Sequence, residues 1–268
     1  MLHLKAVRLD RPDRPLPDAF PFNIPAFHAF ERLELSAPLT FFVGENGSGK
    51  STLLEAIALA SGAIAAGSDS VERDESLNPV RLLAKRLRLV WTKRTHRGFF
   101  LRAEDFFGYA RRLAQMRQSL EADLRAVDEE YVGRSEKARG LAKLASAREL
   151  HALRERYGKD LDNYSHGESF LKFFQARFIP DGLYLLDEPE APLSPLRQLA
   201  FISMLKHMLE QDAQFIIATH SPLIMAFPGA VILGFDQQPI QPIDYAETEH
   251  YTLTRAFLNN PESFLQKL

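Results

Sequence analysis

The sequence predicts an α/β fold with a mainly parallel central sheet and flanking helices. Short apolar runs alternate with longer segments rich in Ala, Leu, Arg and Glu, and strands that alternate with helices form largely parallel sheets. The chain has 268 residues, of which 46% are hydrophobic, so it can bury a core without disulfides or metal. It contains no cysteine, which excludes a disulfide framework, a cysteine nucleophile and any Cys-ligated metal site.

The N-terminal part, residues 1–43, is predicted to be β-rich. Residues 2–9 alternate roughly between apolar and polar side chains, as in a half-buried strand. Residues 33–39 and 40–43 are predicted to be two further strands. The first two strands are separated by a loop, because a dense group of prolines excludes a helix interior or a central strand. These prolines are Pro12, Pro15, Pro17, Pro21 and Pro25.

The next segment leads from a helix into a basic region. Residues 51–60 are rich in Leu and Ala and predict a helix, and residues 61–80 are small and polar and predict a loop. Residues 81–95 fit a helix, a strand or one of each, with the sequence of Leu87–Trp91 favouring a strand in the second half.

A helical subdomain inserted in the core is predicted over residues 105–178. Residues 105–157 contain no proline and are dominated by Ala, Leu, Arg and Glu. Gly133 and Gly140 interrupt this pattern, so two or more helices are expected rather than one. A shorter helix is expected over residues 170–178.

The last third returns to alternating strands and helices. Strands are predicted at residues 183–186, 215–218 and 230–235. A helix is expected over residues 194–210, and residues 248–268 are expected to be helical with a break at Pro261. The whole chain, residues 1–268, is therefore interpreted as one domain.

A glycine-rich loop follows the strand at residues 40–43. Gly44–Ser51 reads GENGSGKS and fits G-x-x-x-x-G-K-[ST] between a strand and a helix, the pattern of a P-loop. Its glycines let several backbone N–H groups point at phosphate oxygens, and the next helix presents its positive end. Lys50 would reach the β- and γ-phosphates, and the Ser51 hydroxyl would ligate Mg²⁺. The predicted ATP-binding residues are Gly44, Glu45, Asn46, Gly47, Ser48, Gly49, Lys50, Ser51 and Thr52.

Two carboxylates follow the apolar run at residues 183–186. Asp187 and Glu188 stand at the carboxyl end of this predicted strand, where open α/β sheets bind their ligands. Asp187 would hold Mg²⁺ together with Ser51, and Glu188 would orient or deprotonate the attacking water. Taken alone, the pair would be interpreted as a helix cap, but beside the P-loop the catalytic interpretation is favoured.

Four further segments, together with the P-loop, resemble the motifs of ABC-type ATPases in their order along the chain. They are Tyr164–Ser169, read as the signature motif, Asp187–Glu190, Ala191–Ser194 and the switch-histidine segment Ala218–Pro222. The resemblance covers about residues 38–236. It points to a stand-alone soluble ATPase similar to the SMC- and RecF-like branch, with a P-loop NTPase fold of the ABC-ATPase type.

The resemblance implies ATP hydrolysis between two copies of the chain. In such ATPases two subunits enclose two nucleotides, so Ser165 and Gly167 would act on the nucleotide of the partner in an ATP-dependent homodimer. His220 would contact the γ-phosphate in its own subunit, with Lys50 and Glu188 as the other catalytic residues. Two plainer interpretations stay open at this point. Ser165 also fits a helix N-cap paired with Glu168, and His220 fits an ordinary core or surface histidine.

The chain departs from the family pattern before the signature motif. No glutamine lies where the Mg²⁺-contacting glutamine loop is expected, because the first Gln after Lys50 is Gln115 in the helical region. Glu104 is a candidate substitute, and Arg102 is a candidate phosphate contact. Two aromatic residues, Phe22 and Phe27, are candidates for stacking on the adenine.

The partner of the ATPase is less clearly indicated. Between residues 81 and 117 there are 11 Lys and Arg residues and only two acidic ones, which suits a DNA phosphate backbone, with the Phe residues and Trp91 stacking on bases. A solvated helix face explains the same charges. The alternative function is the ATP-binding subunit of a membrane ABC transporter, and a third interpretation is a non-catalytic nucleotide sensor.

The location expected from the sequence is the cytoplasm. The longest apolar stretch, residues 56–67, is shorter than the roughly 20 apolar residues of a membrane span. The N-terminus also lacks the apolar core of a signal peptide.

Overall fold

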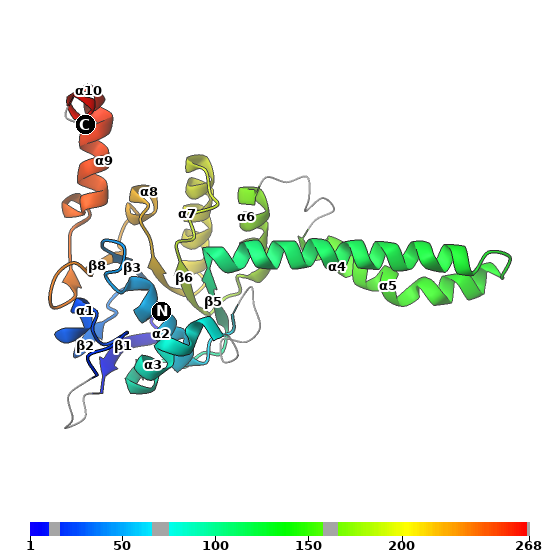
Figure 1. Ribbon diagram of the computed structural model, residues 1–268, viewed down its shortest axis with the longest axis horizontal. Coiled ribbons are helices and arrows are strands. Elements are labelled where there is room, and N and C mark those ends of the chain that lie inside the picture. The colour runs from blue at the N-terminus through cyan, green and yellow to red at the C-terminus, as the bar shows by residue number, and fades with distance from the viewer. Residues whose placement is uncertain (11–16, 66–74, 158–165, 267–268) are drawn as a thin grey trace.

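The computed structural model describes residues 1–10, 17–65, 75–157 and 166–266, and a six-stranded sheet forms its centre (Figure 1). The strand order is β5-β6-β7-β3-β8-β9. The strands are β3 (Leu39–Val43), β5 (Gly98–Arg102), β6 (Leu183–Asp187), β7 (Gln214–Ala218), β8 (Val231–Gly234) and β9 (Gln241–Pro242). The first five are parallel, and only β9 pairs antiparallel, with β8. The predicted mainly parallel sheet is confirmed.

The central strands are continuous apolar runs because both faces of the sheet are covered. Every residue of β3, β6 and β7 is buried, as is typical of parallel strands. Consecutive side chains enter opposite cores. Phe42 and Leu185 pack into one core cluster, and Phe41 and Leu186 pack into the other.

Helices cover both faces of the sheet. One face is covered by α1 (Pro25–His28), α2 (Lys50–Ser61), η1 (Glu75–Val80) and α3 (Arg81–Arg86). The other face is covered by α6 (His166–Arg177), α7 (Pro195–Leu209) and α8 (Pro222–Met225). Aromatic side chains fill this second core, including Phe170, Phe174 and Phe201. The flanking helices predicted from the sequence are therefore confirmed.

A second sheet is built from the N-terminal strands. It has the order β2-β1-β4, with β1 (Leu4–Leu9), β2 (Arg32–Glu34) and β4 (Leu87–Trp91) all antiparallel. The strand predicted over residues 33–39 is wrong, because β2 ends at Glu34 and β3 begins at Leu39. Pro38 lies between them and has no N–H to donate to a strand ladder. Residues 1–43 are thus divided between two sheets.

The basic segment divides into a helix and a strand. The prediction of one of each over residues 81–95 is confirmed by α3 and β4, and the predicted loop at 61–80 contains the short helix η1.

A helical hairpin projects away from the two sheets (Figure 1). It consists of α4 (Ala103–Glu130) and α5 (Glu136–Tyr157). Gly133 lies in the turn between them with φ +82°, as expected of a residue that ends a helix. Gly140 lies inside α5, so its predicted interruption is wrong. A single glycine costs a helix only about 1 kcal/mol, which a 22-residue helix tolerates.

The chain ends in η2 (Tyr245–Glu247), α9 (Glu249–Asn259) and α10 (Pro261–Leu265). The predicted break at Pro261 is confirmed. Within the described ranges, no helix is both long and apolar enough to cross a membrane.

Candidate nucleotide-binding site

The P-loop, Asp187, Glu188 and His220 lie at one edge of the central sheet. The P-loop follows β3, Asp187 ends β6, and His220 follows β7. These strands are adjacent and parallel, so their carboxyl ends meet at the same edge, where α/β sheets bind ligands. Asp236 follows β8 by two residues, and its carboxylate accepts a hydrogen bond from the N–H of Glu45 in the P-loop.

The backbone of the P-loop requires its glycines. Gly44 and Gly49 have φ +148° and +103°. A Cβ atom on Gly44 would lie 2.8 Å from Oδ1 of Asp236, and one on Gly49 would lie 3.0 Å from Cγ2 of Ile24. Helix α2 then begins at Lys50 with no side-chain hydrogen bond at its N-cap. Its first N–H groups are therefore oriented to bind an anion.

Lys50 is buried and bonds to its own loop. Its Nζ donates to the carbonyl oxygens of Gly44 at 2.7 Å and Glu45 at 2.8 Å. Burial lowers the pKa of Lys50, whereas the nearby carboxylates, Asp236 foremost and then Glu188, act to raise it. The ammonium group thus lies at the loop where phosphate oxygens would replace the two carbonyls as its partners.

The two predicted Mg²⁺ ligands are in direct contact. The Ser51 hydroxyl donates to Oδ1 of Asp187 at 3.0 Å. Burial raises the pKa of Asp187 to about 7, against the opposing effect of the Ser51 hydrogen bond. A hydroxyl and a carboxylate are the oxygen donors that Mg²⁺ prefers. In the described part of the chain, no group of three His, Cys, Asp or Glu residues is placed to hold a metal ion.

Glu188 and His220 face each other beside this pair. Glu188 has φ +48°, a left-handed conformation for a non-glycine residue, and such strain is concentrated at functional sites. Its N–H donates to the carbonyl of Ala218 in the adjacent strand, which holds the conformation. Oε1 of Glu188 lies 3.6 Å from Nε2 of His220. Burial, with the charge of Lys50 as the next cause, lowers the pKa of His220 and favours its neutral form.

The loop after β6 is tied to the loop that carries His220. The His220 N–H donates to Oε1 of Glu190 at 2.7 Å, and the Ser221 hydroxyl donates to Oε1 of Gln198 at 2.6 Å. Burial raises the pKa of Glu190. The sequence placed Glu190 only in a motif and did not identify Gln198, because a hydrogen bond between distant segments leaves no local pattern.

Of the two predicted signature residues, the structure describes only Gly167, which contacts α7 and the loop after β6. Ser165 lies outside the described residues, so the structure does not place it. Gly167 is buried in the first turn of α6, and a Cβ atom there would lie 2.7 Å from the carbonyl oxygen of Pro192. Figure 1 places α6 on the far side of α7 from the P-loop. Packing against the loop after β6 therefore explains why this position is a glycine.

The candidate substitutes for the glutamine loop, Arg102 and Glu104, belong to one group of ion pairs at the end of β5. Arg102 is 8% exposed and pairs with Glu55 at 3.3 Å and with Asp105 at 2.8 Å. Glu104 has a side chain that is 76% exposed and lies 3.5 Å from the guanidinium of Arg102. The half-buried carboxylates of Glu55 and Asp105 thus hold the guanidinium of Arg102, and its phosphate contact stays a prediction.

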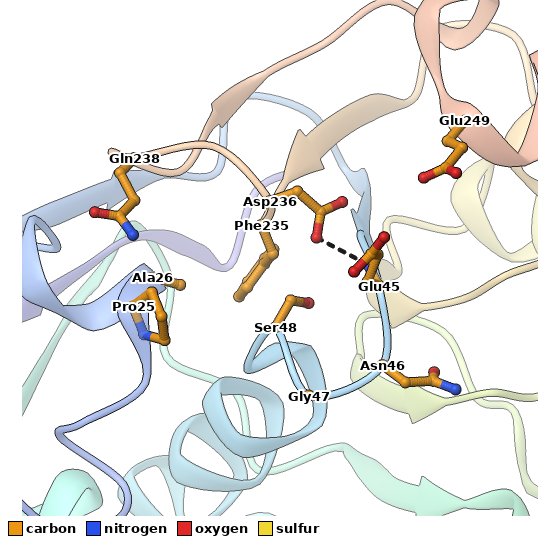
Figure 2. Close-up of a pocket in the computed structure, with 10 residues that line it drawn as sticks. All are labelled: Pro25, Ala26, Glu45, Asn46, Gly47, Ser48, Phe235, Asp236, Gln238 and Glu249. Carbon is orange, nitrogen blue, oxygen red and sulfur yellow. Dashed lines mark hydrogen bonds between the residues drawn. The ribbon is translucent and has the colours of Figure 1, made fainter.

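The two aromatic residues suggested for the adenine are core residues. Phe22 and Phe27 are 4% and 0% exposed, and Phe27 packs beneath Gly49 of the P-loop. Both are therefore corrected as stacking residues. An open cavity of about 470 Å³ instead lies beside the P-loop (Figure 2). Its apolar wall includes Pro25 and Phe235.

Asp236 is the site residue that sequence reasoning missed. Its Oδ1 accepts a hydrogen bond from the N–H of Glu45 at 2.8 Å, as the dashed line in Figure 2 shows. It follows the predicted strand at 230–235 just as Asp187 follows the strand at 183–186. An acidic residue directly after a predicted strand was therefore the sequence pattern that could have identified Asp236. On the same cavity, Oγ of Ser48 is buried and has no hydrogen-bond partner among the described residues.

The basic segment does not form one uniform surface. Lys85, Arg88 and Arg94 are exposed, and Arg88 pairs with Asp10 at 3.1 Å. The aromatic residues Phe99, Phe100 and Phe106 are buried in the two cores. The suggestion that these phenylalanines stack on bases is therefore corrected.

Family models match most of the nucleotide site. A model described as "AAA domain" matches residues 22–146. A second, described as "AAA domain, putative AbiEii toxin, Type IV TA system", matches residues 89–226, more than half of the chain. The chain belongs to this AAA-domain family. The resemblance to P-loop ATPases that the sequence showed is thereby confirmed. The words about a toxin describe the family model and not this chain. No curated protein matches this AAA domain in sequence at a significant level.

Solved structures of similar extent share little sequence with the AAA domain. One is an Smc head domain from Pyrococcus furiosus, with an extended coiled coil and bound to the C-terminal domain of ScpA (13% identity, 98% of this chain and 99% of that one, TM-score 0.45). Another is a nucleotide-free ATP-binding cassette from an ABC transporter (14%, 98% and 97%, TM-score 0.46). A third is cbiO1 from Clostridium perfringens, part of the transporter complex cbiONQ (14%, 100% and 100%, TM-score 0.42).

Proposed function

We propose that the chain binds ATP with Mg²⁺ at this site and hydrolyses it to ADP and phosphate. One observation carries the proposal. The Ser51 hydroxyl meets the carboxylate of Asp187 at 3.0 Å, so the P-loop and the acidic strand form one site. Both ends of that contact are groups that a nucleotide-bound Mg²⁺ requires.

The phosphates would bind across the P-loop and the N-terminus of α2. The ammonium of Lys50 would exchange the carbonyls of Gly44 and Glu45 for phosphate oxygens. Mg²⁺, when bound, would neutralise charge on the phosphate oxygens, and Ser51 and Asp187 would hold it. The nucleoside would occupy the cavity between Pro25 and Phe235.

Glu188 and His220 would act at the γ-phosphate. Glu188 is partly exposed, with 47% of its side chain accessible, so a water molecule can reach its carboxylate. There it would orient that water and accept its proton. His220 would donate a hydrogen bond from Nε2 to a γ-phosphate oxygen, which stabilises the charge that develops there.

The site is proposed to be completed by a second copy of the chain. Gly167 lies in the first turn of α6, and Figure 1 places α6 on the far side of α7 from α2, the helix that follows the P-loop. We therefore expect Gly167 to act on the nucleotide of a second copy. Helix α6 has 12 residues, and its positive N-terminal end suits the γ-phosphate of a partner. ATP would then hold two copies together, and hydrolysis would release them.

The first test is steady-state ATP hydrolysis by the wild type and by Glu188→Gln, with and without DNA. We expect the variant to bind ATP but to lose about 100-fold or more in kcat, and to elute as a dimer with ATP. Hydrolysis at the wild-type rate would contradict the role of Glu188. Glu210→Gln, an exposed change at the end of α7, is the matched control.

The same test addresses the partner. Stimulation by DNA that is lost in Glu188→Gln would support a DNA-acting ATPase. Hydrolysis that DNA leaves unchanged would favour a protein partner or the transporter alternative.

A further inference from the structure

A histidine of the C-terminal helix contacts the histidine of the nucleotide site. Nε2 of His250, in the first turn of α9, lies 2.7 Å from Nδ1 of His220, and the two ring centroids are 4.8 Å apart. Both residues are half-buried. They line a cavity of about 430 Å³ together with Glu45 and Asn46 of the P-loop. The contact therefore lies inside the site and not on an unrelated surface.

The start of α9 is anchored, so the position of His250 is defined. Thr248, the N-cap residue of α9, is 2% exposed. The hydroxyl of Tyr245 donates to the carbonyl of Pro222 in α8 at 3.0 Å, and the ring of Tyr245 packs on that of Tyr251. The helix itself buries no residue fully. Its first turn is thus attached next to His220, while the rest extends outward (Figure 1).

The geometry selects one arrangement of protons on the two rings. A hydrogen bond between two ring nitrogens needs one donor and one acceptor. The other nitrogen of His220, Nε2, is buried and lies 3.6 Å from a carboxylate oxygen of Glu188. A lone pair on Nε2 would be repelled by that carboxylate, whereas an N–H is attracted. His250 therefore donates to Nδ1 of His220, and the ring proton of His220 lies on Nε2.

We propose that His250 is a positioning residue for His220, holding its ring and keeping the proton on Nε2, where it faces the γ-phosphate. The inference rests on the proposed hydrolysis of ATP. It makes the start of the C-terminal helix part of the hydrolytic site. His250 does not touch the nucleotide in this scheme and acts only through His220.

The test compares two substitutions of His250 and one control. His250→Phe keeps a flat ring but cannot donate, and His250→Gln places an amide N–H near the position of Nε2. We expect His250→Phe to lower kcat about tenfold with KM for ATP changed less than about twofold. His250→Gln should restore kcat to within about threefold of wild type. Asn259→Ala, an exposed change at the end of α9, should leave both parameters unchanged.

Two kinetic outcomes overturn the proposal. One is a wild-type kcat in His250→Phe, and the other is a His250→Gln variant as slow as His250→Phe. A second readout is the ¹⁵N chemical shifts of the His220 ring, which report which nitrogen carries the proton. They should change in His250→Phe and stay unchanged in Asn259→Ala, and unchanged shifts in His250→Phe overturn the proposal as well. If the wild type does not hydrolyse ATP, the proposed function fails, and the shifts still decide the histidine contact.

Discussion

The two halves of the candidate site differ in how completely one chain builds them. The P-loop half consists of Gly44–Thr52 with Asp187, Glu188 and His220. Ser51 contacts Asp187, and Glu188 contacts His220. The signature half is the start of α6 with Gly167, whose nearest neighbours belong to the loop after β6 and to α7. The first half is joined by contacts between its own members, whereas the described neighbours of Gly167 include none of these residues.

The difference shows which parts of the site folding alone can assemble. Parallel strands deliver their carboxyl ends to one edge, so the P-loop half forms whenever the central sheet forms. Helix α6 packs against α7, on its far side from α2 (Figure 1). A second chain is therefore the expected source of the missing contacts.

Lys50→Ala should abolish the P-loop half. Without the ammonium group, phosphate loses its main positive partner, and the affinity for ATP should fall by about 100-fold or more. Isothermal calorimetry measures this directly. Lys143→Ala, which removes an ion pair with Asp128 in the helical hairpin, should bind as the wild type does. An unchanged affinity in Lys50→Ala would refute the P-loop assignment.

Mixing two inactive variants should restore activity if the halves come from different chains. In an equal mixture of Lys50→Ala and Ser165→Ala, about half of the dimers are mixed and each has one intact site, so about a quarter of the wild-type rate is expected. A mixture of Lys50→Ala with Glu188→Gln is the control, because both changes lie in the P-loop half. Restoration in the control, or none in the first mixture, would argue against a composite site.

Asp187→Asn should stabilise the nucleotide-free protein while removing a Mg²⁺ ligand. Burial raises the pKa of Asp187 from 3.8 to about 7, so the charged form is disfavoured in the folded state. The free energy of unfolding contributed by this group therefore falls as the pH rises through that interval. At pH 8 the substitution should raise the free energy of unfolding by about 1–3 kcal/mol, and near pH 4 it should change that free energy little.

Denaturant melts of Asp187→Asn at the two pH values check this expectation. A variant less stable than the wild type at pH 8 would contradict it. Added Mg²⁺ and ATP should stabilise the wild type but not the variant, because only the wild type binds both.

Three basic residues, Arg86, Arg88 and Arg94, lie outside both halves of the site. Reversing their charges should have the smallest effect on ATP hydrolysis. If DNA is the partner, its affinity should fall by about tenfold at low salt, and the salt dependence should weaken. ATP hydrolysis without DNA should not change, since none of these residues contacts the P-loop half. Fluorescence anisotropy with labelled DNA measures both quantities. Unchanged binding would exclude this segment as the DNA contact.

The strands, the P-loop and Asp187 were readable from the sequence. Each is a contiguous pattern whose chemistry depends on residues that are neighbours in the chain, such as the glycines of Gly44–Ser51 and the apolar run before Asp187. The break before Pro261 belongs to the same class, because proline acts on its own helix. The ends of the predicted elements were the least reliable part of the prediction. Residues 33–39, for example, were predicted to be one strand, but β2 ends at Glu34 and β3 begins at Leu39.

The contacts of Asp236, Glu190 and His250 were decided only by the tertiary structure. Asp236 meets Glu45 across 191 positions, and His250 meets His220 across 30. The burial of Phe27 and the carboxylate partners of Arg102 likewise depend on helices and strands from distant segments. Periodicity determines which side chains are buried, but the partner of a buried polar group depends on which strand ends and helix starts the packed sheet brings together.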